Sequence, residues 1–144
     1  MKKERDLITA ENRDSASFSA FVEQFIETLL WSGGGEYDGK DASHLSPEAR
    51  QAIEVDCQDF LRRVEDKFLD CDWEMIPRAR MGGEEWEQLA HDYCLTRNGH
   101  GSGFWDGDWD ATGIAKFLTQ ESRLSGEMHP YYGDNYGLIE VFKG

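Results

Sequence analysis

A long amphipathic stretch, residues 47–70, constrains the fold of this chain more than any other feature. Ser46 and Pro47 open it, and these residue types are typical of a helix N-cap and a first helical position. Apolar residues then recur at the spacing of one helical face: Ala49, Ile53, Cys57, Phe60, Leu61, Val64 and Phe68. The pattern predicts a helix of about 24 residues, about 36 Å long, that can serve as the spine of a domain.

Three further stretches have helical periodicity. Residues 18–30 place their apolar side chains on one face, and three glycines from Gly33 predict the end of that helix. Residues 83–95 and 111–124 predict two more helices, the last with Leu124 on its buried face.

The C-terminal segment changes to a strand-like composition. Tyr131 and Tyr132, a turn at 133–137 and the apolar residues that follow predict a β-hairpin. The predicted fold class is therefore α+β: a mainly helical single domain of three to four helices with a C-terminal β-hairpin. Residues 15–144 are expected to form this one globular domain, and residues 1–14 a loose N-terminal arm.

The chain is strongly acidic, with 29 Asp and Glu against 15 Lys and Arg in 144 residues, a net charge of −14. Such a surface repels nucleic acid and anionic membranes, so direct binding to either is not expected, and basic protein surfaces are the natural partners. No stretch approaches the roughly 20 apolar residues of a membrane span. Three cysteines fit a reducing compartment, and we expect a cytoplasmic protein.

The segment TRNGHGSGFWDGDWD, residues 96–110, looks at first like a metal or catalytic site. His91, Cys94 and His100 do not make a recognisable set of zinc ligands. The aspartates at 106, 108 and 110 begin like an EF-hand loop, but the glycine and glutamate that such a loop needs further on are absent. We therefore predict no metal, no cofactor and no catalytic residue.

A structural role explains more of this segment, because only glycine adopts positive φ without strain and several glycines allow a sharp turn after the third helix. Phe104, Trp105 and Trp109 are expected to anchor the turn in the core. Arg97 is expected to pair with an aspartate of the same segment, and His100 to bond a backbone group. The predicted structural residues are Arg97, Gly99, His100, Gly101, Gly103 and Trp105.

Residues 91–106, HDYCLTRNGHGSGFWD, resemble a block in small uncharacterised proteins of bacteriophages and prophages. Its form there is like His-Asp-aromatic-x-Leu-Thr-Arg-Asn-Gly-His-Gly-x-Gly-Phe-Trp-Asp. The likeness continues loosely into YYGDNYGLIEVF near the C-terminus, and the first 80 residues lie outside it. The resemblance implies a phage or mobile-element gene expressed in a bacterial host, and it implies no reaction. Cys94 stands where Trp is common, which indicates packing rather than chemistry at that position.

The leading hypothesis is a non-enzymatic phage protein that inhibits a host nucleic-acid-handling defence protein, a restriction or CRISPR component. DNA mimicry is one means, with carboxylates placed where the target expects phosphates. The residues assigned to this surface are Glu84, Glu85, Glu87, Asp92, Asp106 and Asp108. Two alternatives stay open. One is a small metal-dependent or cysteine/histidine enzyme that uses residues 91–110. The other is a phage accessory protein that binds host proteins through exposed aromatic residues such as Tyr131, Tyr132 and Tyr136.

Overall fold

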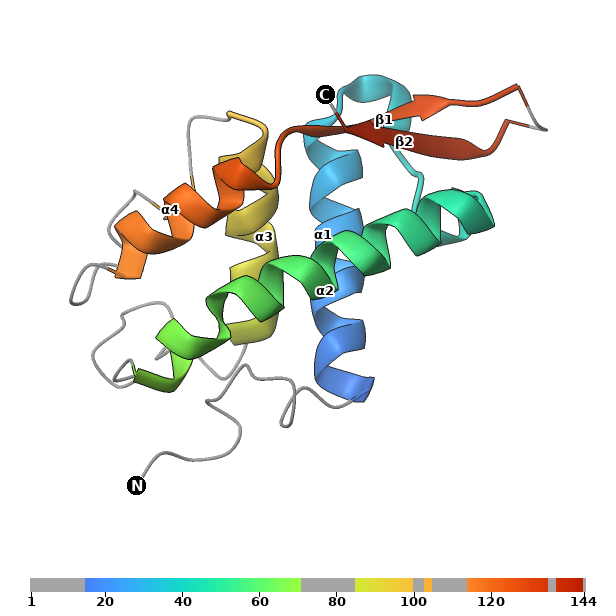
Figure 1. Cartoon of the computed structure of the whole chain (residues 1–144). Coiled ribbons are helices and arrows are strands. Elements are labelled where there is room, and N and C mark those ends of the chain that lie inside the picture. Colours follow the sequence, from blue (N-terminus) through green and yellow to red (C-terminus); the bar gives the residue numbers. More distant parts are fainter. Residues whose placement is uncertain (1–14, 71–84, 100–102, 105–113, 135–136, 144) are drawn as a thin grey trace.

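The computed structural model describes residues 15–70, 85–99, 103–104, 114–134 and 137–143. These residues form four α-helices, two short 3-10 helices and one two-stranded antiparallel sheet (Figure 1). The predicted α+β class, mainly helical with a C-terminal hairpin, is confirmed. The predicted arm, residues 1–14, lies outside the described residues.

The spine helix α2 spans Pro47–Asp70, 24 residues as predicted. It begins where the sequence indicates, because Ser46 Oγ accepts the backbone N–H of Ala49 at 3.0 Å and so satisfies one of the unpaired donors of the first turn. The residue that makes this cap also ties the start of α2 to the C-terminal segment through its backbone. The N–H of Ser46 donates to the carbonyl of Ile139 at 3.0 Å.

Helix α1 spans Ser15–Ser32 and ends at the glycines, as predicted. At Gly33 a Cβ atom would lie 3.0 Å from Pro130 Cγ and 3.1 Å from the ring of Tyr37. The glycine therefore lets the C-terminal hairpin approach the end of α1. Between α1 and α2 lie two single turns, η2 (Gly35–Tyr37) and η3 (Ala42–His44).

Helices α3 and α4 span Glu85–Arg97 and Ile114–Leu124. Helix α3 continues two residues beyond the predicted end. The prediction for Leu124 is wrong, because its side chain is 73% exposed. It lies six residues after the buried Leu118, about 240° further around the helix, and so faces solvent.

The strands β1 (Met128–Tyr132) and β2 (Ile139–Lys143) form the hairpin. His129 is paired with Phe142, and Tyr131 with Glu140. Because side chains alternate along a strand, these four residues share one face of the hairpin, and Met128 and Ile139 lie on the other. Met128 and Ile139 are fully buried, so the second face packs against the body of the protein.

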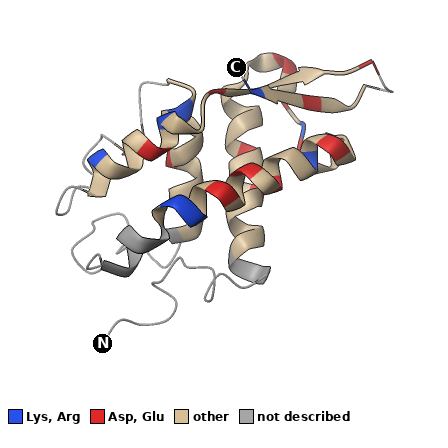
Figure 2. Cartoon of the chain, viewed as in Figure 1, with Lys and Arg blue, Asp and Glu red and all other residues tan. Residues whose placement is uncertain are grey.

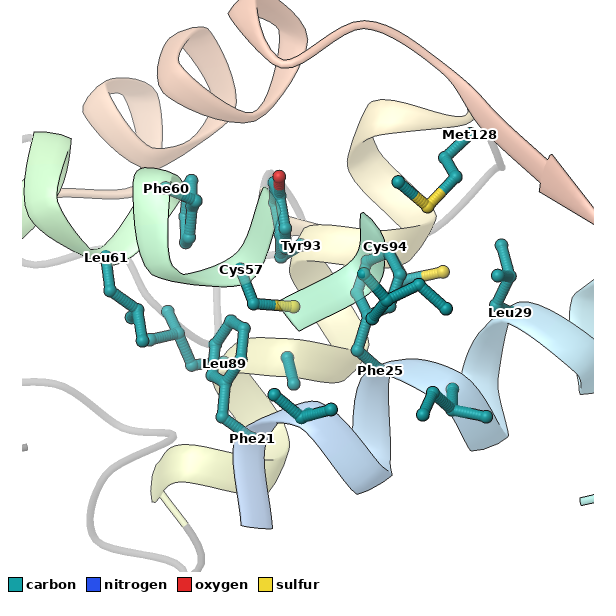
Figure 3. Packing of buried hydrophobic residues seen from close by; sticks show 14 of the residues in the cluster. Phe21, Phe25, Leu29, Cys57, Phe60, Leu61, Leu89, Tyr93, Cys94 and Met128 are labelled. Carbon is teal, nitrogen blue, oxygen red and sulfur yellow. The ribbon is translucent and has the colours of Figure 1, made fainter. Parts of the chain in front are cut away.

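The core lies where α2 crosses α1 and α3, which lie side by side and run in the same direction (Figure 1). Its centre is aromatic: Phe60 of α2 stacks on Tyr93 of α3 with ring centroids 3.9 Å apart, and Phe25 of α1 lies 5.5 Å from Tyr93 (Figure 3). Helix α4 packs on α3 and α2. This three-helix crossing fixes the side chains described next.

Candidate functional site

A buried ion pair joins α2 to the end of α3. The guanidinium of Arg97 donates to both carboxylate oxygens of Asp56, at 2.5 and 3.1 Å, and the two side chains are 0% and 4% exposed. The prediction that Arg97 pairs with an aspartate of its own segment is therefore wrong. The carboxylate comes from the spine helix, because α3 ends with Arg97 aimed across the core at α2 instead of along the chain.

The other groups of this cluster are also bonded. Arg97 Nε and Nη2 donate to the carbonyls of Gly126 and Ser125 at 2.7 and 3.0 Å. The Tyr93 hydroxyl donates to Asp56 at 2.7 Å and lies 2.9 Å from Ser125 Oγ. Burial disfavours the charged form of Arg97, but Tyr93 and Asp56 outweigh it and raise the pKa of Arg97 above its ordinary value. With its donors occupied by the protein, Arg97 has a structural role.

Sequence reasoning missed Asp56, although a signal for it exists. Asp56 follows Ile53 by three residues, which places a carboxylate on the apolar face of α2. Arg97 follows Cys94 by the same interval on the apolar face of α3. Charged residues at core positions are almost always paired, so these two positions together indicate a buried ion pair.

Cys94 is a core residue and not an exposed nucleophile. Its side chain is 0% exposed, and burial raises the pKa of its thiol to about 12. Cys57 is equally buried, and burial raises the pKa of its thiol as well. A thiolate is the reactive form of cysteine, so neither thiol is poised for nucleophilic attack.

His91, the described histidine of this region, contacts α1. His91 Nδ1 lies 3.0 Å from Thr28 Oγ1 of α1, and its ring lies 6.0 Å from the ring of Trp31. His100 lies outside the described residues. Within the ranges that are described, no group of three or more His, Cys, Asp or Glu side chains could hold a metal ion.

The glycine segment is described only in part. Gly99 and Gly103 have positive φ, 73° and 156°, as predicted for a sharp turn after α3. Phe104 is fully buried, also as predicted, and its N–H donates to Thr96 Oγ1 at 3.1 Å. Gly101, Trp105 and Trp109 lie outside the described residues, so their predicted roles stay predictions.

The acidic residues assigned to a binding surface separate into three groups. Asp92 is 1% exposed, so it cannot lie against a partner, and its assignment to the surface is wrong. It occupies the inner side of α3, three residues after Leu89. Glu87 is partly exposed on α3, and Glu85 is the first residue of that helix, with its side chain outside the description. Glu84, Asp106 and Asp108 lie outside the described residues.

The excess of acid is nevertheless a property of the described fold. Those ranges hold 19 of the 29 acidic residues and 9 of the 15 basic ones, a net charge of −10. Acidic residues occur on the helices, on the segment between α1 and α2 and on the hairpin (Figure 2). The exposed ones are Glu23, Glu27, Glu36, Asp38, Asp41, Glu48, Asp59, Glu127 and Asp134.

Basic residues neutralise some of these acidic residues, and the extent differs from one part of the fold to another. On α1 and α2, Arg50 pairs with Glu23 at 2.5 Å and Arg63 pairs with Asp59 at 2.6 Å, so part of the helical charge is neutralised locally. At the hairpin end, residues 35–50 and 127–143 together hold seven acidic and three basic residues, a net charge of −4. We call this part of the molecule the acidic end.

The hairpin also exposes aromatic rings at the acidic end. Tyr131 and Phe142 are 44% and 49% exposed, with ring centroids 5.8 Å apart. Tyr132 is half-exposed but is held on the inner face, because it stacks on Tyr37 at 5.3 Å and its hydroxyl donates to the carbonyl of Glu36 at 2.7 Å. An exposed aromatic pair beside carboxylates is a surface suited to binding another molecule.

Comparison with known proteins found no matching family model, no matching curated protein and no matching solved structure. Among the described helices, none combines the length and the apolar character needed to cross a membrane. Any functional assignment must therefore come from the surfaces and side chains described above.

Proposed function

We propose that this chain is a phage- or mobile-element-encoded binding protein that inhibits a host nucleic-acid-handling protein in the bacterial cytoplasm. Its target would be a defence protein of the restriction or CRISPR type, bound through the basic surface that normally holds nucleic acid. The chain would not act as an enzyme. Carboxylates of the folded domain would occupy positions that phosphates take in the target's own complex.

The observation that carries this proposal is the charge of −10 within the described fold. Because this charge belongs to packed helices and a hairpin, the backbone holds the acidic residues in one arrangement. A fixed array of negative charge attracts a basic protein surface and raises the rate at which the two proteins meet.

A second candidate is a phage accessory protein that binds a host protein mainly through aromatic side chains. The exposed rings of Tyr131 and Phe142 favour it. The two candidates differ in what displaces the partner, since only a partner held at its nucleic-acid site is displaced by nucleic acid.

The proposal is tested by immobilising the full chain and passing over it a bacterial host lysate that is free of nucleic acid. We expect the column to retain a nucleic-acid-handling protein that is eluted by rising salt and by duplex DNA or guide RNA. A retained protein that salt elutes but nucleic acid does not would favour the accessory protein instead.

Matched charge-reversal variants separate a specific surface from bulk charge. Glu36→Lys, Asp38→Lys and Glu48→Lys change three exposed acids of the acidic end. The control changes three acids outside the described fold by the same amount: Glu4→Lys, Glu11→Lys and Asp14→Lys. Retention should fall with the first set and persist with the second. Equal losses would reduce the interaction to net charge.

A further inference from the structure

We infer that the outer face of the C-terminal hairpin is a docking site for an extended, arginine-rich segment of a partner protein. We call this surface the hairpin face; it consists of His129, Tyr131, Glu140 and Phe142, together with Glu127. The inference rests on the proposed function, since it names the part of the basic partner that this chain would hold.

Three rings on the hairpin face form a row. The rings of His129 and Phe142 lie 5.7 Å apart, and those of Phe142 and Tyr131 lie 5.8 Å apart. The row crosses from one strand to the other and back, as expected for residues on one face of an antiparallel pair. Two of its rings are nearly half exposed, which offers planar surfaces on which a guanidinium group can stack.

A carboxylate lies at each end of this row. Glu127 Oε1 lies 2.7 Å from His129 Nε2, and the side chain of Glu127 is well exposed. At the other end Glu140 is paired across the strands with Tyr131, and its Oε1 accepts the hydroxyl of Ser46 at 2.5 Å. Rings bounded by carboxylates suit arginine, whose guanidinium stacks on aromatic faces and also forms forked hydrogen bonds to carboxylates.

The charge around the hairpin face favours a positively charged ligand. The acidic end carries a net charge of −4, and Lys143, the nearest lysine in the strands, is held 3.2 Å from the buried carboxylate of Asp56. A negatively charged ligand such as single-stranded nucleic acid could stack on the same rings but would be repelled by these charges. Charge complementarity therefore favours a basic protein segment.

The free edge of β1 is not available for pairing with another strand. Pro130 has no N–H, and its carbonyl accepts the hydroxyl of Tyr37 at 2.9 Å. The N–H of Met128 donates to Asn98 Oδ1 at 2.8 Å. A partner segment that binds at β1 therefore lies on the face of the hairpin, where the rings are, and does not extend the sheet at this edge.

The test titrates the full chain with a nona-arginine peptide and follows backbone amide shifts by NMR. Saturable shifts are expected in residues 127–131 and 140–142. The double variant Tyr131→Ala and Phe142→Ala should weaken binding about tenfold, since two stacking contacts are lost. Phe142→Leu keeps an apolar side chain without a π face and should weaken binding to a smaller extent. Trp31→Ala removes an even more exposed ring, from α1, and should leave binding within about twofold.

Several results would overturn the inference. These are shifts spread over α1 and α2, equal weakening by Trp31→Ala, or preferential binding of oligothymidylate at the same residues. Dimerisation of the chain that is lost in the Tyr131→Ala and Phe142→Ala variant would assign the face to a second copy. Folding of each variant is checked by its thermal melt, and Phe142→Leu serves if the double variant fails to fold.

The same variants distinguish this inference from the proposed function. A lysate protein that nucleic acid displaces and that still binds the Tyr131→Ala and Phe142→Ala variant would uphold the proposed function and reject the hairpin face. Specific binding of nona-arginine at the hairpin, without any lysate partner that nucleic acid displaces, would uphold the hairpin face and reject inhibition of a nucleic-acid-handling protein.

Discussion

The Arg97 cluster, which consists of Arg97, Asp56 and Tyr93, buries charged side chains, whereas the hairpin face exposes apolar ones. Arg97 and Asp56 are charged residues at the centre of the molecule, each with several hydrogen bonds. Tyr131 and Phe142 are aromatic residues at its surface, nearly half exposed. Both regions depart from the usual burial of apolar and exposure of polar side chains.

The difference shows which departures point to structure and which to binding. A buried charge whose hydrogen bonds are all made within the protein has no bonding capacity left for a ligand, so it stabilises one arrangement of helices. An exposed ring keeps its face available, and covering it with a partner is favourable. The hairpin therefore indicates binding more strongly than residues 91–106 indicate chemistry.

Arg97→Met should have the largest effect, because it leaves the carboxylate of Asp56 buried without its main partner. We expect the free energy of unfolding to fall by about 3–5 kcal/mol. The measurement is urea unfolding, with Arg62→Met on the exposed side of α2 as the control. The double variant Asp56→Leu and Arg97→Met should be more stable than Arg97→Met alone. A loss below about 1 kcal/mol in the single variant would show that the cluster does not stabilise the fold.

The two faces of the hairpin should differ sharply in their response to truncation. Ile139→Ala removes a fully buried side chain from the inner face and should lower the free energy of unfolding by about 2–4 kcal/mol. Phe142→Ala on the outer face should change it by no more than about 0.5 kcal/mol. Denaturant melts measure both. A loss at Phe142 as large as that at Ile139 would mean that the outer face is packed and is not a docking surface.

Alkaline pH should destabilise the protein through its buried thiols. The pKa of Cys94 is raised from 9.0 to about 12 in the folded state, so the unfolded chain loses this proton first. The contribution of this thiol to the free energy of unfolding is fully present below about pH 9. It is lost as pH rises towards 12, by about 1.4 kcal/mol per pH unit for one such group. Cys94→Ala should reduce this slope in urea melts at pH 9–11. A free energy of unfolding that does not vary over that range would contradict the burial of Cys94.

Gly99→Ala should lower the free energy of unfolding by less than Arg97→Met, Ile139→Ala or alkaline pH. At a φ of 73° an alanine is strained, while no atom of the described residues other than its chain neighbours lies within 4 Å of the new Cβ. The expected loss of unfolding free energy is about 1–2 kcal/mol, from the backbone alone. Asn tolerates this conformation better, so thermal melts of Gly99→Asn should show a smaller loss. Equal losses in the two variants would indicate a contact of the side chain rather than backbone strain.

Much of the fold follows from local sequence. The beginning of α2 is encoded by Ser46 and Pro47, since a side-chain cap and a residue without an N–H act within one turn. The end of α1 is encoded by the glycines from Gly33, and the hairpin by its turn and its alternating side chains. These features depend on neighbours in the chain, so periodicity and composition are enough to predict them.

The candidate sites follow from the sequence only in part. The acidic charge and the exposed Tyr131 were predictable, because charge is additive and a short terminal hairpin has few side chains to cover its outer face. The exposure of Leu124 and the burial of Asp92 were not predicted, because a rotation of one or two residues about a helix axis reverses which side chains reach the core.

The helices, the hairpin, the net charge of −14 and the buried character of Cys57 and Cys94 follow from the amino-acid sequence. The pairing of Arg97 with Asp56, 41 residues away, and the position of Glu127 and Glu140 at the two ends of one row of rings arise only from the packing of the elements. Secondary structure depends on interactions within a few residues along the chain. Ion pairs and surfaces depend on which helices cross and in what rotation, and that is settled only when the whole core packs.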